Sequence, residues 1–102
     1  MPKEKLEVVF AKCRLMRFIS HLDLLRLFQR ALRRADIPFS LTCGYNPHPK
    51  VSIRRALKLG EESDHEVAIF SLDEAMDPGE FKARFQQQLP DGIIIKEVSY
   101  KE

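Results

Sequence analysis

Residues 20–35 constrain the fold more than any other stretch, because they form a predicted helix with two unlike faces. Ser20 is a suitable N-cap, and Asp23 in the first turn resembles the acidic member of a capping box and complements the helix dipole. Pro38 ends the helix, since proline cannot continue the hydrogen-bond ladder. At about 100° per residue, one side is largely apolar and must be covered by other parts of the chain. That side contains His21, Leu24, Leu25, Phe28, Ala31, Leu32 and Ala35.

The opposite side of this helix is cationic. It carries Arg26, Arg30, Arg33 and Arg34. These arginines have few acidic partners four residues away, and a second basic cluster follows at Arg54, Arg55 and Lys58. Uncompensated cations on two elements favour a surface that follows nucleic-acid phosphates, although an ordinary solvated surface is about equally common. The sequence lacks the aromatic signature of an RRM-type RNA-binding domain.

The order of the predicted elements indicates an α+β fold, the ferredoxin-like βαββαβ sandwich. We expect one domain over residues 1–102, with an antiparallel sheet and two helices on one face. Residues 6–15 form a predicted strand that is apolar on both faces, which is typical of a central strand. Residues 51–59 and 66–72 form a predicted antiparallel hairpin around a polar turn at 60–64.

The remaining elements have clear local signals. Residues 39–42 are expected to form a short extended piece before an irregular loop. Asp77 and Pro78 begin a predicted second helix, whose buried stripe is expected to contain Phe81, Phe85 and Leu89. Residues 93–100 form the last predicted strand.

Charge is distributed unevenly along the chain. The formal net charge is +2, but residues 1–60 carry 13 Lys and Arg against 4 Asp and Glu, whereas residues 61–102 carry 4 against 11. A fold that kept these halves apart would be electrically polarised. Such a molecule could attract a polyanion, an acidic protein or a second copy of itself.

The segment Asn46-Pro47-His48-Pro49-Lys50 has the least common composition in the chain, because two prolines restrict the backbone around a single imidazole. One hypothesis is that His48 is held at a fixed angle to donate to a phosphate, transfer a proton or bind a metal. The alternative, at about even odds, is that the prolines shape an irregular edge.

Several of these residues could form one anion-binding pocket. Lys12 and Arg14 share the parity of Phe10, so the end of the first strand is expected to bring positive charge to the start of the helix. Backbone N–H groups and the helix dipole would add to this charge. The predicted anion site consists of Lys12, Ser20, His21, Asn46, His48 and Lys50, and the predicted nucleic-acid surface consists of Arg26, Arg30, Arg33, Arg34, Arg54 and Arg55. A buried, hydrogen-bonded structural histidine is the commoner role for a residue placed like His21.

Other chemistry has little support in the sequence. Zinc binding by His21, His48 and Asp23 is a minority interpretation, because Asp23 points away from the apolar side of its helix. No glycine-rich nucleotide loop is present, and the sequence predicts no cofactor. Cys13 and Cys43 form no CxxC pair and are expected to be reduced. No apolar run could span a bilayer, and the N-terminal residues do not resemble a signal peptide, so we expect a cytoplasmic protein.

Two motifs carry a family resemblance. The stretch Phe18-Ile19-Ser20-His21-Leu22-Asp23, together with Gly44-Tyr45-Asn46-Pro47-His48-Pro49-Lys50, resembles the bacterial radical SAM-linked protein family, a domain of unknown function. The similarity extends through Leu89-Pro90-Asp91-Gly92 and so covers nearly the whole chain. It implies a domain encoded beside, or fused to, a radical SAM protein. Onto this sequence the family pattern places Lys12, Ser20, His21, Asp23, Arg30, Arg34, Asn46, His48 and Lys50. The chain has no CxxxCxxC motif for the iron–sulfur cluster, so any role is an accessory one.

Three functions are open at this point. The first is an accessory domain that binds RNA or another phosphate-bearing substrate through the basic helix face and a histidine-containing pocket. The second is an interaction module that docks on a radical SAM enzyme, and homodimerisation is a further alternative. The third is a hydrolase that uses His48 as an acid or base, although we expect no activity from the chain on its own. A weaker fold-level similarity connects the chain to the RAMP-type RNA-binding proteins of CRISPR systems.

Overall fold

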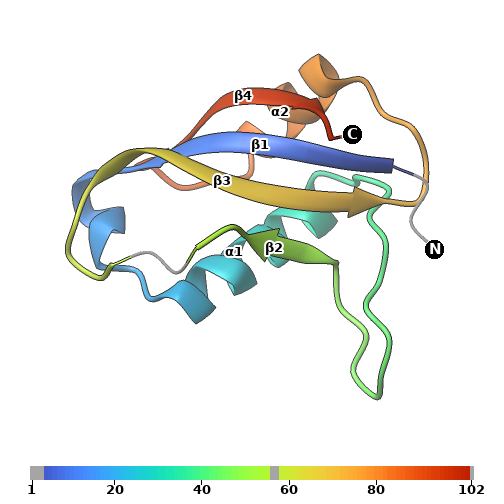
Figure 1. Cartoon of the computed structure of the whole chain (residues 1–102), viewed down its shortest axis with the longest axis horizontal. Coiled ribbons are helices and arrows are strands. Elements are labelled where there is room, and N and C mark those ends of the chain that lie inside the picture. Colours follow the sequence, from blue (N-terminus) through green and yellow to red (C-terminus); the bar gives the residue numbers. More distant parts are fainter. Residues whose placement is uncertain (1–3, 56–57, 102) are drawn as a thin grey trace.

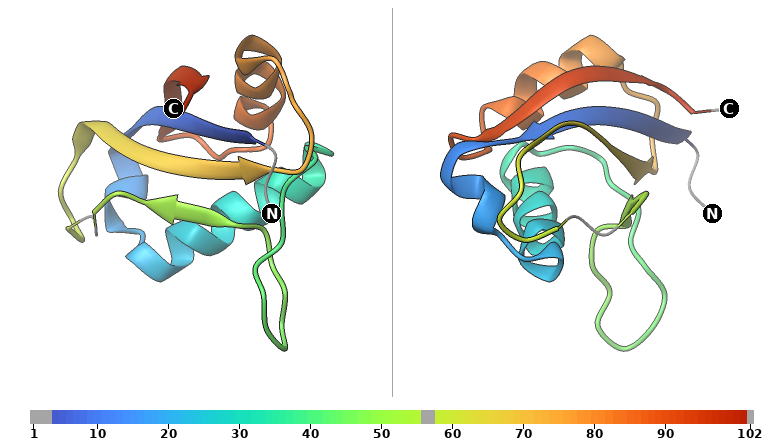
Figure 2. Two further views of the ribbon diagram at one scale, coloured as in Figure 1. Left: turned by 45° about the vertical axis from the view of Figure 1, so that its right-hand side comes forward. Right: turned by 60° about the vertical axis from the view of Figure 1, so that its left-hand side comes forward.

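The computed structural model describes residues 4–55 and 58–101 and has an α+β architecture. A four-stranded antiparallel sheet has the strand order β2-β3-β1-β4, and both α-helices cover one of its faces (Figures 1 and 2). This is the predicted ferredoxin-like βαββαβ arrangement. The strands are β1 (Glu4–Lys12), β2 (Val51–Ile53), β3 (Ser63–Leu72) and β4 (Ile93–Tyr100), and the helices are η1 (Arg14–Phe18), α1 (His21–Arg34) and α2 (Pro78–Gln86).

The prediction that the first strand is central is confirmed, because β1 pairs with β3 on one side and with β4 on the other. The strand begins at Glu4, before the predicted start at residue 6, and ends before the predicted end at residue 15. It ends at Lys12, and Arg14 has a φ of 56°, which is incompatible with an extended strand. The chain then forms η1, where Leu15 is 77% exposed.

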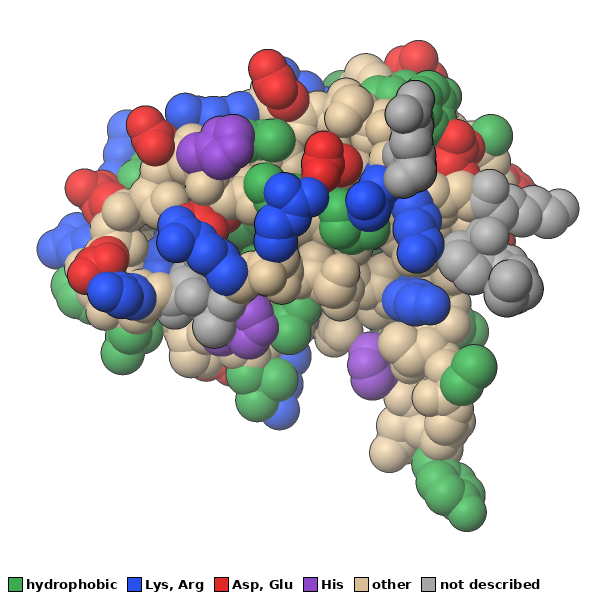
Figure 3. Space-filling view, in the orientation of Figure 1, with side chains coloured by type: hydrophobic (Ala, Val, Ile, Leu, Met, Phe, Trp, Pro, Cys, Tyr) green, Lys and Arg blue, Asp and Glu red, His purple; other side chains and the backbone are tan. Residues whose placement is uncertain are grey.

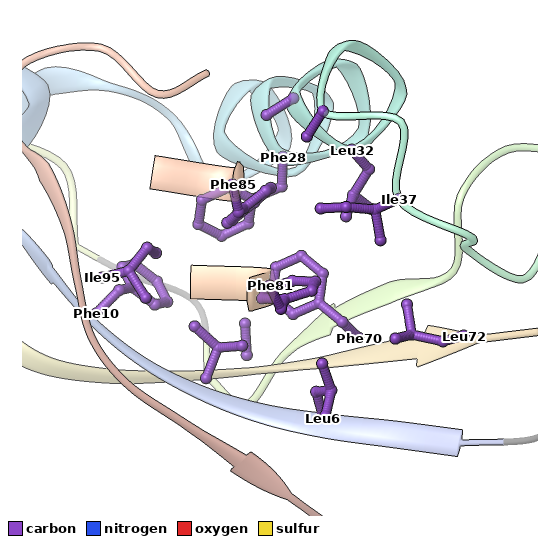
Figure 4. Packing of buried hydrophobic residues seen from close by; sticks show 14 of the residues in the cluster. Leu6, Phe10, Phe28, Leu32, Ile37, Phe70, Leu72, Phe81, Phe85 and Ile95 are labelled. Carbon is purple, nitrogen blue, oxygen red and sulfur yellow. The ribbon is translucent and has the colours of Figure 1, made fainter. Parts of the chain in front are cut away.

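Both α-helices begin where the capping residues predicted. The Ser20 hydroxyl accepts a hydrogen bond from the Asp23 N–H at 3.1 Å, and the Asp77 carboxylate accepts one from the Glu80 N–H at the same distance. The buried faces of α1 and α2 meet the sheet in a core rich in phenylalanine (Figure 4). Its five rings belong to Phe10, Phe28, Phe70, Phe81 and Phe85.

The predicted hairpin differs from the observed one in its length. β2 covers only Val51–Ile53 of the predicted range 51–59, and β3 starts at Ser63, three residues before the predicted 66. Residues 56 and 57 of the predicted strand lie outside the described residues. The described residues of segment 54–62 leave the edge of the sheet. Two side-chain contacts hold them: Lys12 donates to the Lys58 carbonyl, and Arg55 donates to the Glu66 carboxylate. The predicted piece 39–42 forms single bridges, from Phe39 to Leu72 and from Leu41 to Pro49.

The two oppositely charged halves of the sequence are not kept apart. β1, from the basic half, lies between β3 and β4 from the acidic half. Acidic and basic side chains are accordingly interspersed over the body in Figure 3. The excess of positive charge persists locally over residues 21–50, which carry five Lys and Arg against two Asp.

Gly92, which directly precedes β4, has a backbone conformation that other residues rarely adopt. Its φ is +100°, and an added Cβ would lie 2.6 Å from the Cys13 carbonyl oxygen. We expect Gly92→Ala to lower the free energy of unfolding by about 2 kcal/mol, through the positive φ and this contact. Urea unfolding of the variant and of Gly44→Ala would measure it. Gly44 also has a positive φ but has open space around it, so an equal loss in both variants would contradict a role for the contact.

None of the α-helices within the described residues has the length and apolar character needed to cross a membrane.

Candidate functional site

The arginine side of α1 faces away from the core, as predicted. The buried residues Leu24 and Phe28 face the sheet, whereas the four arginines of α1 are exposed. Arg26 lies 3.6 Å from the Asp23 carboxylate. Among the described residues, no carboxylate forms an ion pair with any of the other three, Arg30, Arg33 and Arg34. This face therefore carries positive charge that the described part of the chain does not neutralise.

Residues 41–50 form a narrow projection, here called the finger, which stands out from the body of the molecule (Figures 1 and 3). The Thr42 N–H donates to the His48 carbonyl at 2.9 Å, and the His48 N–H donates to the Thr42 hydroxyl at 3.2 Å. The His48 ring nitrogen Nδ1 lies 2.9 Å from the Asn46 carbonyl. These contacts give the finger an ordered shape that leaves the His48 ring exposed.

The finger lies beside the arginine side of α1. Gln29 donates from Nε2 to the Pro49 carbonyl at 3.5 Å, and the Arg33 guanidinium lies 5.3 Å from the centre of the Phe39 ring, just before the finger. Arg26, Gln29 and Arg33 are spaced by three and four residues, so they share one strip of the helix. Figure 2 shows the finger leaving the body near α1 and projecting away from it. The structure therefore joins the base of the finger, at Pro49, to this strip of α1, and the finger residues Asn46, His48 and Lys50 are exposed.

Ser20 and His21 lie elsewhere, at the start of α1. Gln29, where the finger meets the helix, is eight residues after His21, which corresponds to about 12 Å along the axis. The Ser20 hydroxyl is already engaged as the helix cap. His21 is partly buried, and its Nδ1 atom has no hydrogen-bond partner among the described residues. His21 and His48 therefore lie near different ends of α1 and do not form one site.

Lys12 is not at the surface, contrary to the expectation that Lys12 and Arg14 bring charge to the start of the helix. Its side chain is 1% exposed, and its Nζ atom donates to the Lys58 carbonyl at 2.9 Å. Lys12 continues the row of β1 that faces the core, and the segment after β2 covers it. Arg14 points to Asp91, where one guanidinium nitrogen lies 2.8 Å from both carboxylate oxygens.

Lys12 lines a pocket of about 220 Å³ that includes neither His21 nor His48. The described lining residues are Lys12, Arg55, Lys58, Glu61, Glu62, Ser63 and Glu66. Burial lowers the pKa of Lys12, and the nearby carboxylates of Glu66 and Glu61 oppose this shift. The pocket combines a desolvated amine with acidic neighbours.

Glu66 is the important residue that the sequence interpretation missed. It lies opposite Phe10 in the β1–β3 register and is 3% exposed. Its carboxylate accepts two hydrogen bonds from Arg55, at 3.1 and 2.9 Å, and a third from the Ser63 hydroxyl. Burial alone would raise the pKa of Glu66, but these hydrogen bonds hold it below its usual range. Its parity was an available signal, because Glu66 shares the core-facing side of β3 with Ala68 and Phe70.

The interpretation of Arg54 and Arg55 as uncompensated cations was wrong. Arg54 pairs with Glu7 at 2.6 Å, and Arg55 pairs with Glu66. Cross-strand carboxylates in β1 and β3 supply the partners, which lie too far along the sequence to be recognised from helical or local spacing. Of the six arginines predicted to bind nucleic acid, only Arg30, Arg33 and Arg34 form no ion pair with a described carboxylate.

No group of three or more His, Cys, Asp or Glu side chains suited to a metal ion occurs in residues 4–55 and 58–101. Cys13 and Cys43 are both free thiols.

Comparison with known proteins identifies a family model that matches residues 5–102 and is described as "Uncharacterized protein conserved in bacteria (DUF2344)". No curated protein and no solved structure matches the chain.

Proposed function

The chain belongs to this bacterial family of uncharacterised proteins, and we propose that it is an accessory domain that binds RNA. The binding surface consists of Arg26, Arg30, Arg33, Arg34, His48 and Lys50. The observation that carries the proposal is that Arg30, Arg33 and Arg34 form no ion pair with a described carboxylate, on a helix that contacts, through Gln29, an ordered finger with further exposed donors. We infer that this function is exercised in the cytoplasm.

Arginine suits this role because its guanidinium can donate two parallel hydrogen bonds to a phosphate. Lys50 and the exposed His48 ring would extend the contact from the helix onto the finger. The finger projects next to α1, so it would obstruct insertion of the helix into the major groove of a DNA duplex (Figure 1). An RNA strand or loop can bend to follow both elements, which favours RNA over duplex DNA.

A second role, docking on a radical SAM protein, is favoured by an apolar surface at the other end of α1. Leu15, Phe18, Leu22 and Leu59 are all large, exposed hydrophobic residues. Leu15 and Phe18 are three residues apart in a 3₁₀-helix and therefore share one side of it. A Cβ added at Gly60, next to Leu59, would lie 4.0 Å from the Phe18 ring. Exposed apolar patches of this kind are typical of protein interfaces.

Docking through this surface can be tested by co-expression with a radical SAM protein encoded beside the chain. We expect the two to co-purify without nucleic acid, and Leu15→Glu to abolish the association. Retention of the partner by Leu15→Glu would contradict docking through this surface.

RNA binding itself is tested by its dependence on salt. We expect the affinity for a fluorescein-labelled RNA, measured by fluorescence anisotropy, to fall steeply as KCl is raised. Three to five phosphate contacts correspond to a slope of about −2 to −3.5 in log association constant against log salt concentration. Binding that does not respond to salt, or no measurable binding at low salt, would rule out the proposed surface.

A further inference from the structure

Tyr45 stands at the projecting end of the finger and has no structural role there. Its relative exposure is 104%, the highest among the large hydrophobic residues that are exposed. An aromatic ring left in water forgoes the stabilisation that burial of its large apolar surface would provide. The fold therefore gains nothing from an aromatic side chain at this position.

The finger holds Tyr45 away from the body in a defined position. Between Tyr45 and the body, the two sides of the finger contact each other. Thr42 and His48 exchange two hydrogen bonds, and Leu41 and Pro49 form a β-bridge. Gly44, with a φ of +123°, makes the turn that precedes Tyr45. An ordered support reduces the entropy that would be lost when the ring binds a partner.

The surroundings of the finger indicate what that partner is. The base of the finger rests on Gln29, in the α1 strip that also contains Arg26 and Arg33, and Lys50 follows directly after the finger's buried Pro49. Proteins that bind single-stranded nucleic acid usually combine cations along the phosphate backbone with an aromatic ring on which a base can stack. A duplex conceals its base faces and offers the ring nothing to stack on.

We propose that Tyr45 stacks on an unpaired base, so that the ligand of this surface is single-stranded RNA or the loop of a folded RNA; this inference rests on the proposed RNA binding. The arginines of α1 bind the phosphates, and the finger selects for an accessible base. Tyr45 contributes binding and selectivity without sequence specificity, because every base presents an aromatic face.

The test compares the affinities of Tyr45→Ala and Tyr45→Phe for a labelled oligouridylate and for an RNA duplex of equal length. Tyr45→Ala should weaken oligouridylate binding about 10-fold and leave duplex binding unchanged, whereas Tyr45→Phe should bind as the wild type does. Since the side chain is fully exposed, the thermal unfolding temperature should be the same in all three proteins.

A direct readout is available because the chain has no Trp and only two Tyr. In a Tyr100→Phe background, Tyr45 is the only strong emitter, and stacking should quench its fluorescence as oligouridylate is added. Duplex RNA should cause no such quenching.

The outcomes separate the two proposals. If Tyr45→Ala binds oligouridylate as tightly as the wild type while binding remains salt-dependent, the stacking inference fails and the proposed RNA surface stands. If the wild type binds neither RNA at low salt, both fail. If Tyr45→Ala keeps its RNA affinity but loses a co-expressed radical SAM protein, the finger is a protein anchor and the inference is overturned.

Discussion

Glu66→Gln is expected to lower the free energy of unfolding by about 3 kcal/mol at neutral pH. The substitution keeps the size of the side chain but removes the carboxylate, and the ammonium of Lys12, 1% exposed, loses a nearby negative charge. The bidentate contact from Arg55 and the hydrogen bond from Ser63 are weakened at the same time. Urea unfolding followed by circular dichroism would measure the loss.

A second substitution identifies the cause of this loss. Burial lowers the pKa of Lys12, so its charged form is already disfavoured inside the protein. Combining Lys12→Met with Glu66→Gln removes both buried charges and should recover most of the lost stability, whereas independent sites would give additive losses. Glu80→Gln is the matched control, because Glu80 pairs with Arg84 at an exposed position and should cost less than about 1 kcal/mol. Equal losses in Glu66→Gln and Glu80→Gln would contradict the buried-charge explanation.

The same carboxylate makes stability depend on acidity. The pKa of Glu66 in the folded protein lies below its usual value of 4.5, so its contribution is fully present above that value. The contribution is lost as the pH falls through the lowered pKa. Glu66→Gln cannot lose it, and its unfolding free energy should therefore decline less steeply below pH 4.5 than that of the wild type.

The fold was largely predictable because its signals are local. The caps at Ser20 and Asp77 and the apolar periodicity of α1 and α2 define two helices. The two apolar faces of residues 6–11 mark the central strand. With the right-handed crossover rule, these elements leave few topologies, and the ferredoxin-like one is observed.

The buried pair of charges was harder to predict because it depends on contacts distant in sequence. Parity was an available signal, since Lys12 shares it with Phe10 and Glu66 shares it with Ala68, but the sequence interpretation placed Lys12 at the surface and missed Glu66. Whether that end of the sheet is exposed or covered depends on the segment after β2, which has no regular periodicity. Its attachment through the Lys58 carbonyl and through Arg55 joins residues 46 and 11 positions apart. Glu7 on β1, the partner of Arg54, was hard to predict for the same reason, because it lies 47 positions away in the sequence.

The candidate RNA surface was predictable in part. The exposed arginines follow from helical periodicity, and the prolines around His48 predicted a stiff loop. The position of the finger beside Arg33 and Gln29, and away from His21, follows from the packing of α1 next to β2. The predicted roles of His21 and Ser20 in anion binding stay predictions. The structure locates these two residues at the start of α1, away from the finger that carries His48.

Reversing the charge of two arginines on α1 should have the largest effect on RNA binding. We expect Arg30→Glu combined with Arg34→Glu to weaken the affinity for oligouridylate about 100-fold at low salt. Two phosphate contacts are replaced by repulsion, and the slope of log affinity against log salt should become shallower by about 1.4. Neither arginine forms an ion pair with a described carboxylate, so the unfolding free energy should change little.

The matched control changes the net charge by the same amount at another place. Lys96→Glu combined with Lys101→Glu alters exposed residues in and just after β4, at the sheet edge opposite β2. If binding depends on the particular surface formed by α1 and the finger, this control should keep most of its affinity and its full salt slope. If both pairs weaken binding equally, RNA responds only to the overall charge of the protein, and the arginine face of α1 has no special role.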